Sequence, residues 1–279
     1  MKQNKGWLAK EDYEEPVCLL DGIPDKPRNV KPVPQQRIME KVEEYMSRRD
    51  YAAVERHLLY WLEEAKMGND ERGELMIRNE LIGHYRKSGK KEEALAEIRE
   101  ALRLLDDLDY KETRSAGTTY INCATALNAF GENERSLELF EEAEKVYEKL
   151  NQVDPGLLGG LYNNMALTCA ALGRYTQAHT LYAKALELMG TVENGALEQA
   201  ITCLNEADVY AAELGTEASE ARVYALLDKA EELLKTEGIP HDGYYAFVCE
   251  KCAPAFEHYG YFLTAQDLKR QAQEIYERD

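Results

Sequence analysis

Apolar and polar residues alternate with a helical period through most of the chain. In the segment that follows Gly131, for example, Ser136, Phe140 and Ala143 recur at steps of four and three residues. Such steps place side chains on one face of an α-helix, and the small residues among them let a neighbouring helix approach closely. Because the pattern returns several times between residues 35 and 279, it predicts an all-α chain of packed helices.

Five glycines divide this pattern into repeats of nearly equal length. The first four lie 42 residues apart and the fifth follows after 45, at Gly89, Gly131, Gly173, Gly215 and Gly260. A glycine between two helices provides a left-handed turn that other residues adopt only at a steric cost. We therefore expect a helical hairpin around each glycine, with a first helix before it and a second helix after it. The predicted repeats lie near residues 35–74, 75–116, 117–158, 159–200, 201–245 and 246–279.

Two local deviations fall after residue 200. Asp208 stands seven residues before Gly215, where the repeat around Gly173 has the small residue Ala166. The small and apolar pattern after Gly215 resumes three residues late, at Val223. This delay predicts a lengthened turn over residues 216–220.

Two helix starts are marked by polar residues next to proline. Asp154 followed by Pro155 predicts an N-cap and a first helical turn. Pro240, shortly before Asp242, predicts a second helix start. These residues set boundaries and carry no chemistry.

The segment LYNNMALTCAALGRYTQAHTLYAKALEL supports a family resemblance. It resembles a tetratricopeptide repeat, especially the 42-residue variety of kinesin light chains. The likeness is good over residues 75–200 and weaker in the flanking repeats, as capping repeats should be. The chain departs from the family where the latter favours Trp, at Tyr120, Tyr162 and Leu204. The resemblance implies a TPR-like right-handed superhelix, an α-solenoid of about six hairpins over residues 35–279.

The first 34 residues differ from the repeats. Five prolines are spread through charged sequence, at Pro16, Pro24, Pro27, Pro32 and Pro34, and they exclude a helical repeat. Trp7, Leu8 and Leu19 give this segment apolar surface. One interpretation is an extended N-terminal arm that docks on the array or on a second copy, and the other is a partly disordered tail.

Net charge, apolar runs and cysteine content limit the expected partners and the expected cellular location. The chain has 52 acidic and 34 basic residues, a formal net charge of −18, so its average field repels nucleic acid and anionic lipid. A membrane span would require a long apolar run, and a leader would require an apolar stretch after the N-terminal lysines; neither occurs in the sequence. The six cysteines are too few for a disulfide scaffold. We expect a cytoplasmic protein that binds neither nucleic acid nor membrane.

Sequence signatures of enzymes do not occur. The chain has no phosphate-binding glycine loop, no H-E-x-x-H and no G-x-S-x-G, and its five histidines are scattered singly. Paired carboxylates such as Glu92 and Glu93 fit solvated helix faces. We therefore predict no catalytic activity and no cofactor.

One constellation resembles a metal site in its residue types. Cys249 and Cys252 form a C-x-x-C pair, with His241 before and His258 after them. Both cysteines, however, fall on core positions of a predicted first helix, whereas zinc-binding pairs normally lie on a tight turn. We interpret them as core residues and predict no metal.

The candidate binding surface is the concave side of the array, which first helices line in stacked hairpins. The residues predicted to face it are Asn79, Arg86, Asn122, Thr125, Asn128, Asn163, Asn164, Leu167, Asn205 and Glu206. Asparagine both donates and accepts, so it can pair with a peptide backbone whatever the peptide's side chains. In kinesin light chains and related peptide-sensing repeat proteins, asparagines at matching places grip ligand backbone. The resemblance implies this role for Asn122, Asn163, Asn164 and Asn205; the alternative is that they bond between adjacent helices.

The predicted function is therefore that of a non-enzymatic adaptor or scaffold for an extended polypeptide. Acidic residues near the groove, such as Glu80 and Glu250, favour a neutral to basic partner. Two other functions stay open, a peptide-sensing regulatory protein and a self-assembling scaffold such as a homodimer.

Overall fold

The computed structural model describes residues 30–150, 153–193 and 195–278. Over these residues the secondary structure is twelve α-helices without a strand, which confirms the all-α prediction. The chain divides into two compact units, residues 1–151 and 152–279. Unit 1 contains α1 (Gln35–Ser47), α2 (Tyr51–Met67), α3 (Glu71–Ser88), α4 (Lys91–Asp107), α5 (Arg114–Ala129) and α6 (Asn133–Lys149). Unit 2 contains α7 (Pro155–Ala171), α8 (Tyr175–Met189), α9 (Ala196–Leu214), α10 (Thr216–Leu234), α11 (Gly243–His258) and α12 (Phe262–Tyr276).

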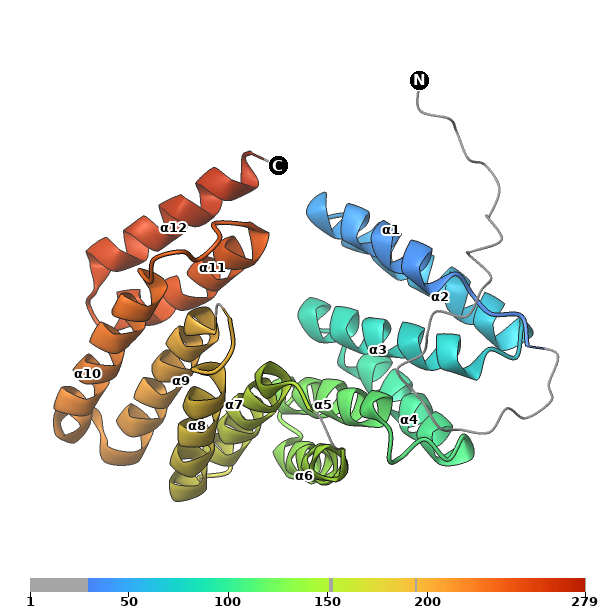
Figure 1. Ribbon diagram of the computed structural model, residues 1–279, viewed down its shortest axis with the longest axis horizontal. Helices are drawn as coiled ribbons and strands as arrows, with labels where there is room; N and C mark the ends of the chain where they lie inside the picture. The colour runs from blue at the N-terminus through green and yellow to red at the C-terminus, as the bar shows by residue number, and fades with distance from the viewer. Residues whose placement is uncertain (1–29, 151–152, 194, 279) are drawn as a thin grey trace. The chain divides into compact units, whose positions relative to one another are not determined.

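Successive helices pack in pairs within each unit (Figure 1). The hairpins of unit 1 are α1–α2, α3–α4 and α5–α6, and those of unit 2 are α7–α8, α9–α10 and α11–α12. First helices also contact one another, α3 with α5 in unit 1, and α9 with both α7 and α11 in unit 2. This is the packing expected of stacked helical hairpins, and it confirms the predicted fold within each unit.

The glycines that set the repeat spacing lie in the turns between paired helices. Gly89, Gly131 and Gly173 have φ angles of 71°, 78° and 72°, in the left-handed region that favours glycine. Each carries the chain from a first helix into a second helix within a few residues. The prediction from their 42-residue spacing is confirmed.

The expected lengthened turn after Gly215 is wrong. Gly215, with φ 78°, is the single residue between α9 and α10, and residues 216–220 already belong to α10. This segment contains Glu217, Ala218 and Glu220, which are good helix formers, and Glu217 lies in the first turn, where the helix dipole favours a negative charge. The three additional residues therefore lengthen the helix, which has 19 residues. Ser219 occupies the added turn and is buried.

The two predicted helix starts are present. The side chain of Asp154 accepts a hydrogen bond from Gly156 N at 2.7 Å, and Pro155 is the first residue of α7. Asp242 caps α11 by accepting from the backbone N–H groups of Tyr244 and Tyr245. Each cap satisfies backbone donors that the first helical turn leaves without partners.

The described cysteines are buried in the cores of the units. Cys123 lies in unit 1, and Cys169, Cys203, Cys249 and Cys252 lie in unit 2, all as free thiols. Burial raises the pKa of the Cys252 thiol to about 12, so the thiolate that a metal ion requires is disfavoured. The interpretation of the C-x-x-C pair as core packing is confirmed. Within the described residues, no group of three or more His, Cys, Asp or Glu side chains is placed to hold a metal ion.

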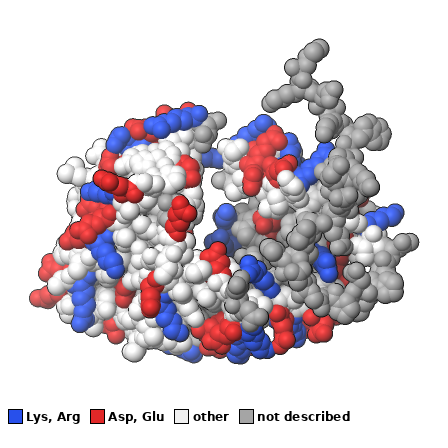
Figure 2. Space-filling model, in the orientation of Figure 1, with Lys and Arg blue, Asp and Glu red and all other residues white. Residues whose placement is uncertain are grey.

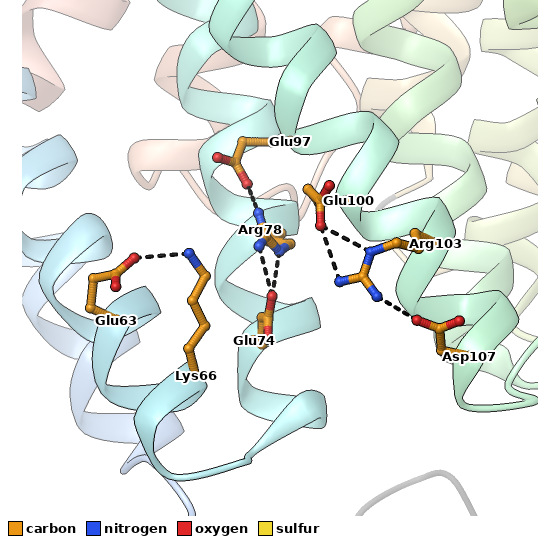
Figure 3. A network of polar contacts seen from close by, with 8 residues as sticks. All are labelled: Glu63, Lys66, Glu74, Arg78, Glu97, Glu100, Arg103 and Asp107. Carbon is orange, nitrogen blue, oxygen red and sulfur yellow. Dashed lines mark hydrogen bonds and ion pairs between the residues drawn. The ribbon is translucent and has the colours of Figure 1, made fainter.

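A buried ion network ties α3 to α4 in unit 1 (Figure 3). Arg78 donates to the Glu74 carboxylate on its own helix at 2.7 Å and also pairs with Glu97 on α4. The Arg78 side chain is 5% exposed. Nearby on α4, Arg103 pairs with Glu100 and Asp107 at the surface, with its side chain 51% exposed. The first network is thus shielded from water, whereas the second is solvated.

Residues 30–34 precede α1 without helical structure. Lys31 N donates to Gly68 O at 2.8 Å, and Val33 N donates to the Asp70 carboxylate at 2.8 Å. Val33 is buried against unit 1. The remainder of the predicted arm, residues 1–29 with Trp7 and Leu8, lies outside the described residues.

Acidic and basic side chains are interspersed over the face shown in Figure 2. The helices of the described part of the chain include none long and apolar enough to cross a membrane.

Candidate partner-binding site

The residues predicted to face the groove all lie on first helices. Unit 1 carries Asn79 and Arg86 on α3 and Asn122, Thr125 and Asn128 on α5, and unit 2 carries Asn163, Asn164 and Leu167 on α7 and Asn205 and Glu206 on α9. Most of these side chains are half-buried, and Asn163 is 6% exposed. Their burial arises because first helices contact one another within each unit.

Asn79 and Asn122 join two first helices of unit 1. The Nδ2 of Asn122 donates to Oδ1 of Asn79 at 3.2 Å. Asn79 in turn donates to Thr119 Oγ1 at 2.9 Å and to Leu75 O at 3.0 Å. The amide of Asn79 is therefore held by α3 and α5, as in the alternative interpretation of the asparagines.

Asn163 and Asn205 make the equivalent connection in unit 2. The Nδ2 of Asn205 donates to Oδ1 of Asn163 at 3.1 Å and bridges α9 and α7. Asn164, the next residue on α7, is half-buried, and its carboxamide has no hydrogen-bond partner among the described residues. Of this pair of neighbours, Asn163 serves the packing of helices and Asn164 retains donor and acceptor capacity.

Glu206 is already paired within unit 2. Its carboxylate lies 3.1 Å from Nδ1 of His179 on α8, and Glu213 lies 3.1 Å from Nε2 of the same ring. The imidazole also stacks on Tyr210, with the ring centroids 4.0 Å apart. Since His179 occupies its carboxylate, Glu206 has less capacity to receive a partner's cation than the sequence suggested.

The predicted groove residues of unit 1 are similarly occupied in part. Asn128 donates to Oδ1 of Asn133 at 3.2 Å across the turn between α5 and α6. Arg86 is half-buried, and burial lowers the pKa of its guanidinium. Burial also raises the pKa of Glu80, which weakens the negative charge expected there.

A surface hollow of about 450 Å³ opens between α9 and α11 in unit 2. We call it the α9–α11 hollow; α9 contributes Ile201, Leu204, Asn205 and Asp208 to it, and α11 contributes Lys251, Cys252, Pro254, Ala255 and His258. Its apolar lining includes buried Ile201 and Leu204, whereas Asp208, Lys251 and His258 are exposed. Of the residues predicted from the sequence, Asn205 is the one that lines this hollow.

Asp208 differs in burial from the matching residues of other hairpins. The matching residues of other hairpins, Ala124, Ala166 and Ala253, are at most 1% exposed. An ionised carboxylate cannot be buried in this way without a large desolvation cost, and Asp208 is exposed. Tyr259, which follows the last residue of α11, donates its hydroxyl to Asp208 Oδ1 at 2.8 Å.

A stripe of side chains on α11 continues from the hollow. The α11 stripe consists of Tyr244, Phe247, Lys251, Pro254 and His258, spaced by three and four residues so that they share one helix face. Tyr244 and Phe247 are 46% and 48% exposed, with their ring centroids 6.2 Å apart in a stacked arrangement. Tyr244 also donates its hydroxyl to the Glu198 carboxylate on α9. This stripe was not predicted from the sequence, although its spacing of three and four residues is a usable signal.

Pro254 adds a backbone feature to the stripe. It lies inside α11 and has no N–H to donate to the carbonyl of Glu250, four residues earlier. That carbonyl is consequently without its regular helical donor. The stripe thus combines two exposed aromatic rings, the cation of Lys251 and a proline that interrupts the helical hydrogen bonds.

Comparison with known proteins identifies the hairpin type. Residues 159–192, which cover most of α7 and all of α8, match the family model described as tetratricopeptide repeat. This chain contains a tetratricopeptide repeat. The resemblance drawn from the segment around Gly173 is confirmed. No curated protein matches the chain.

A comparison with solved structures finds similar helical repeats, and one of these reaches a TM-score that supports a shared fold. One is a point-substituted form of the nearly identical TPR-like repeats of a Podosopora anserina protein described as a kinesin light chain, at 17% identity and a TM-score of 0.50. The match covers 71% of this chain and 92% of that one. The unsubstituted repeats give a TM-score of 0.49 with the same identity and coverage. BtubC (BKLC) from P. vanneervenii gives 18% identity and a TM-score of 0.48, covering 86% of this chain and 88% of that one.

Proposed function

We propose that this chain is a non-enzymatic adaptor or scaffold, and that an extended segment of a partner protein binds along the first helices of unit 2. The tetratricopeptide fold supports the general role, since stacked hairpins present extended surfaces that recognise polypeptides. The observation that carries the location is the α9–α11 hollow, which lies beside Asn205 and continues into the α11 stripe. A cytoplasmic location remains a prediction from the sequence.

The hollow and stripe together have the composition of a recognition surface. Buried anchors at interfaces are enriched in aromatic residues, and the rings of Tyr244 and Phe247 are both exposed. Asn205, Asp208 and Lys251 add polar groups around an apolar lining. An extended segment requires this mixture, because its backbone is polar and its side chains vary.

The experiment is an affinity measurement on a partner identified by co-purification with the full chain. Phe247→Ala should weaken binding by on the order of tenfold, the loss expected for a central aromatic contact. Leu59→Ala is the matched control, because Leu59 on α2 of unit 1 is 40% exposed and lies outside the hollow and stripe. Equal affinities of wild type and Phe247→Ala, with both folded, would remove this site.

Self-assembly is a second candidate function. Phe262 and Leu263 at the start of α12 are 66% and 84% exposed. Adjacent apolar side chains with this exposure favour a protein contact. Sedimentation of wild type and of the double variant Phe262→Ser, Leu263→Ser would test it; a monomeric wild type at all concentrations would exclude it.

A further inference from the structure

We propose that the α9–α11 hollow selects a lysine or arginine side chain of the bound segment, and that Asp208 is the residue that determines this preference. The inference rests on the proposed function and names the chemistry of the partner at that site. It depends on three features of unit 2, namely the position of Asp208 in the repeat, its charge and the lining of the hollow.

The position of Asp208 shows that the carboxylate replaces packing. At the matching place Ala124, Ala166 and Ala253 are buried between helices. Asp208 instead borders open volume. A carboxylate here adds no apolar burial to unit 2, and its exposed position at the hollow leaves it accessible to a partner's side chain.

The charge of Asp208 is not neutralised within the described residues. Glu206 faces His179 and Glu231 faces Lys235, but no described cation lies within ion-pair distance of Asp208. Its contact with Tyr259 involves a neutral phenol, and burial together with the Asp208 carboxylate raises the pKa of that phenol. The hydrogen bond therefore engages Oδ1 of Asp208, and Oδ2 has no described donor.

The lining suits the remainder of a long basic side chain. Pro254, which is exposed, and Ala255, which is half-buried, can cover the methylene groups of lysine or arginine, whose charged ends stay at the polar rim. Lys251 and His258 belong to α11, whereas Asp208 belongs to α9, so the partner's cation is directed to the α9 side.

The test uses the full chain and three short, blocked, fluorescently labelled peptides with the same apolar background. They differ only in the central residue, which is Arg, Gln or Glu. Fluorescence anisotropy should show the Arg peptide binding about three- to fivefold tighter than the Gln peptide, as expected for one partly exposed ion pair. Asp208→Asn, which preserves shape and can still accept from Tyr259, should abolish this difference.

Two further variants sharpen the result. Asp228→Asn is the matched control, because Asp228 on α10 also accepts a tyrosine hydroxyl, that of Tyr261, but does not line the hollow. It should retain the preference. Lys251→Gln should strengthen binding of the Arg peptide, since it removes a like charge from the rim.

The outcomes separate this inference from the proposed function. A preference for the Glu peptide, or an Arg preference that persists in Asp208→Asn, overturns the assignment of Asp208. Equal affinity for the three peptides, with binding that still requires Phe247, overturns the inference and leaves the proposed function standing. Absence of binding by all three peptides counts against both.

Discussion

The carboxamide of Asn205 on α9 donates to the carboxamide oxygen of Asn163 on α7 at 3.1 Å. The two residues occupy matching places in consecutive hairpins, 42 residues apart. Asn79 and Asn122 form a similar pair in unit 1. At these four positions asparagine joins adjacent hairpins.

Removal of Asn205 should destabilise unit 2. In Asn205→Ala the nearly buried Oδ1 of Asn163 loses its donor, and an unsatisfied buried polar atom costs about 1–3 kcal/mol. Asn164→Ala is the control, and it should change the free energy of unfolding by less than about 0.5 kcal/mol. Urea unfolding followed by circular dichroism measures both. Similar decreases in the free energy of unfolding for the two variants would show that the Asn163–Asn205 hydrogen bond does not contribute specifically to stability.

Arg78 should be among the most sensitive positions of unit 1. Arg78→Ala leaves the shielded carboxylates of Glu74 and Glu97 without their cation, and breaking a buried pair in this way costs about 3–5 kcal/mol. Arg103→Ala disrupts solvated pairs and should cost less than about 1 kcal/mol. Chemical denaturation of the two variants gives the comparison, and a loss of similar size in both would contradict the effect of burial.

Two glycines of unit 2 should respond in opposite directions to alanine. Gly173 has φ 72°, and forcing a side chain into this conformation costs about 1–2 kcal/mol. Gly160 lies inside α7, where an added Cβ meets no atom within 4 Å, so Gly160→Ala should stabilise by about 0.5–1 kcal/mol. Thermal unfolding should place Gly160→Ala above wild type and Gly173→Ala below it. The opposite order would refute this account of the turn.

Unit 2 should lose stability in alkaline solution. Burial and a carboxylate acceptor raise the pKa values of Tyr244 and Tyr259 above the ordinary 10.0. Because the folded pKa is raised, this stabilisation is fully present below the ordinary pKa and disappears as the pH rises through the folded values. The unfolding midpoint should therefore fall as the pH is raised above the ordinary tyrosine pKa.

Phenylalanine variants identify the tyrosines responsible. Tyr244→Phe and Tyr259→Phe remove the titrating hydroxyls, so the double variant should show a shallower alkaline decline than wild type. Tyr51→Phe is the control, since Tyr51 is 50% exposed on α2 of unit 1. If the double variant declined as steeply as wild type, these two hydroxyls would not be the cause.

The sequence was sufficient for the features that depend on spacing along the chain. Gly89 and Gly173 predicted turns because positive φ favours one residue type, and Asp154 with Pro155 predicted a cap for an equally local reason. Cys252 was placed in the core by its helical register. In each case the relevant physics acts within a few residues of the chain.

Features that depend on contact between hairpins were less accessible. Register placed Asn163 and Asn164 together near the groove, but one bonds to α9 and the carboxamide of the other has no described partner. Whether an asparagine bonds to the next helix depends on its side-chain rotamer and on the distance between helices. Residue spacing along the chain predicts neither. The departure at Asp208 was visible in the sequence, whereas the hollow beside it depends on how α9 and α11 approach each other.

Pro254 gives α11 a missing backbone N–H that substitutions at other residues do not restore. Point changes at Tyr244, Phe247 or Lys251 can alter shape and charge, yet none of them gives the carbonyl of Glu250 the N–H that Pro254 lacks. Only a change at residue 254 itself would restore the missing donor. Partners can change as the side chains do, while this acceptor stays in the helix for as long as the imino acid does.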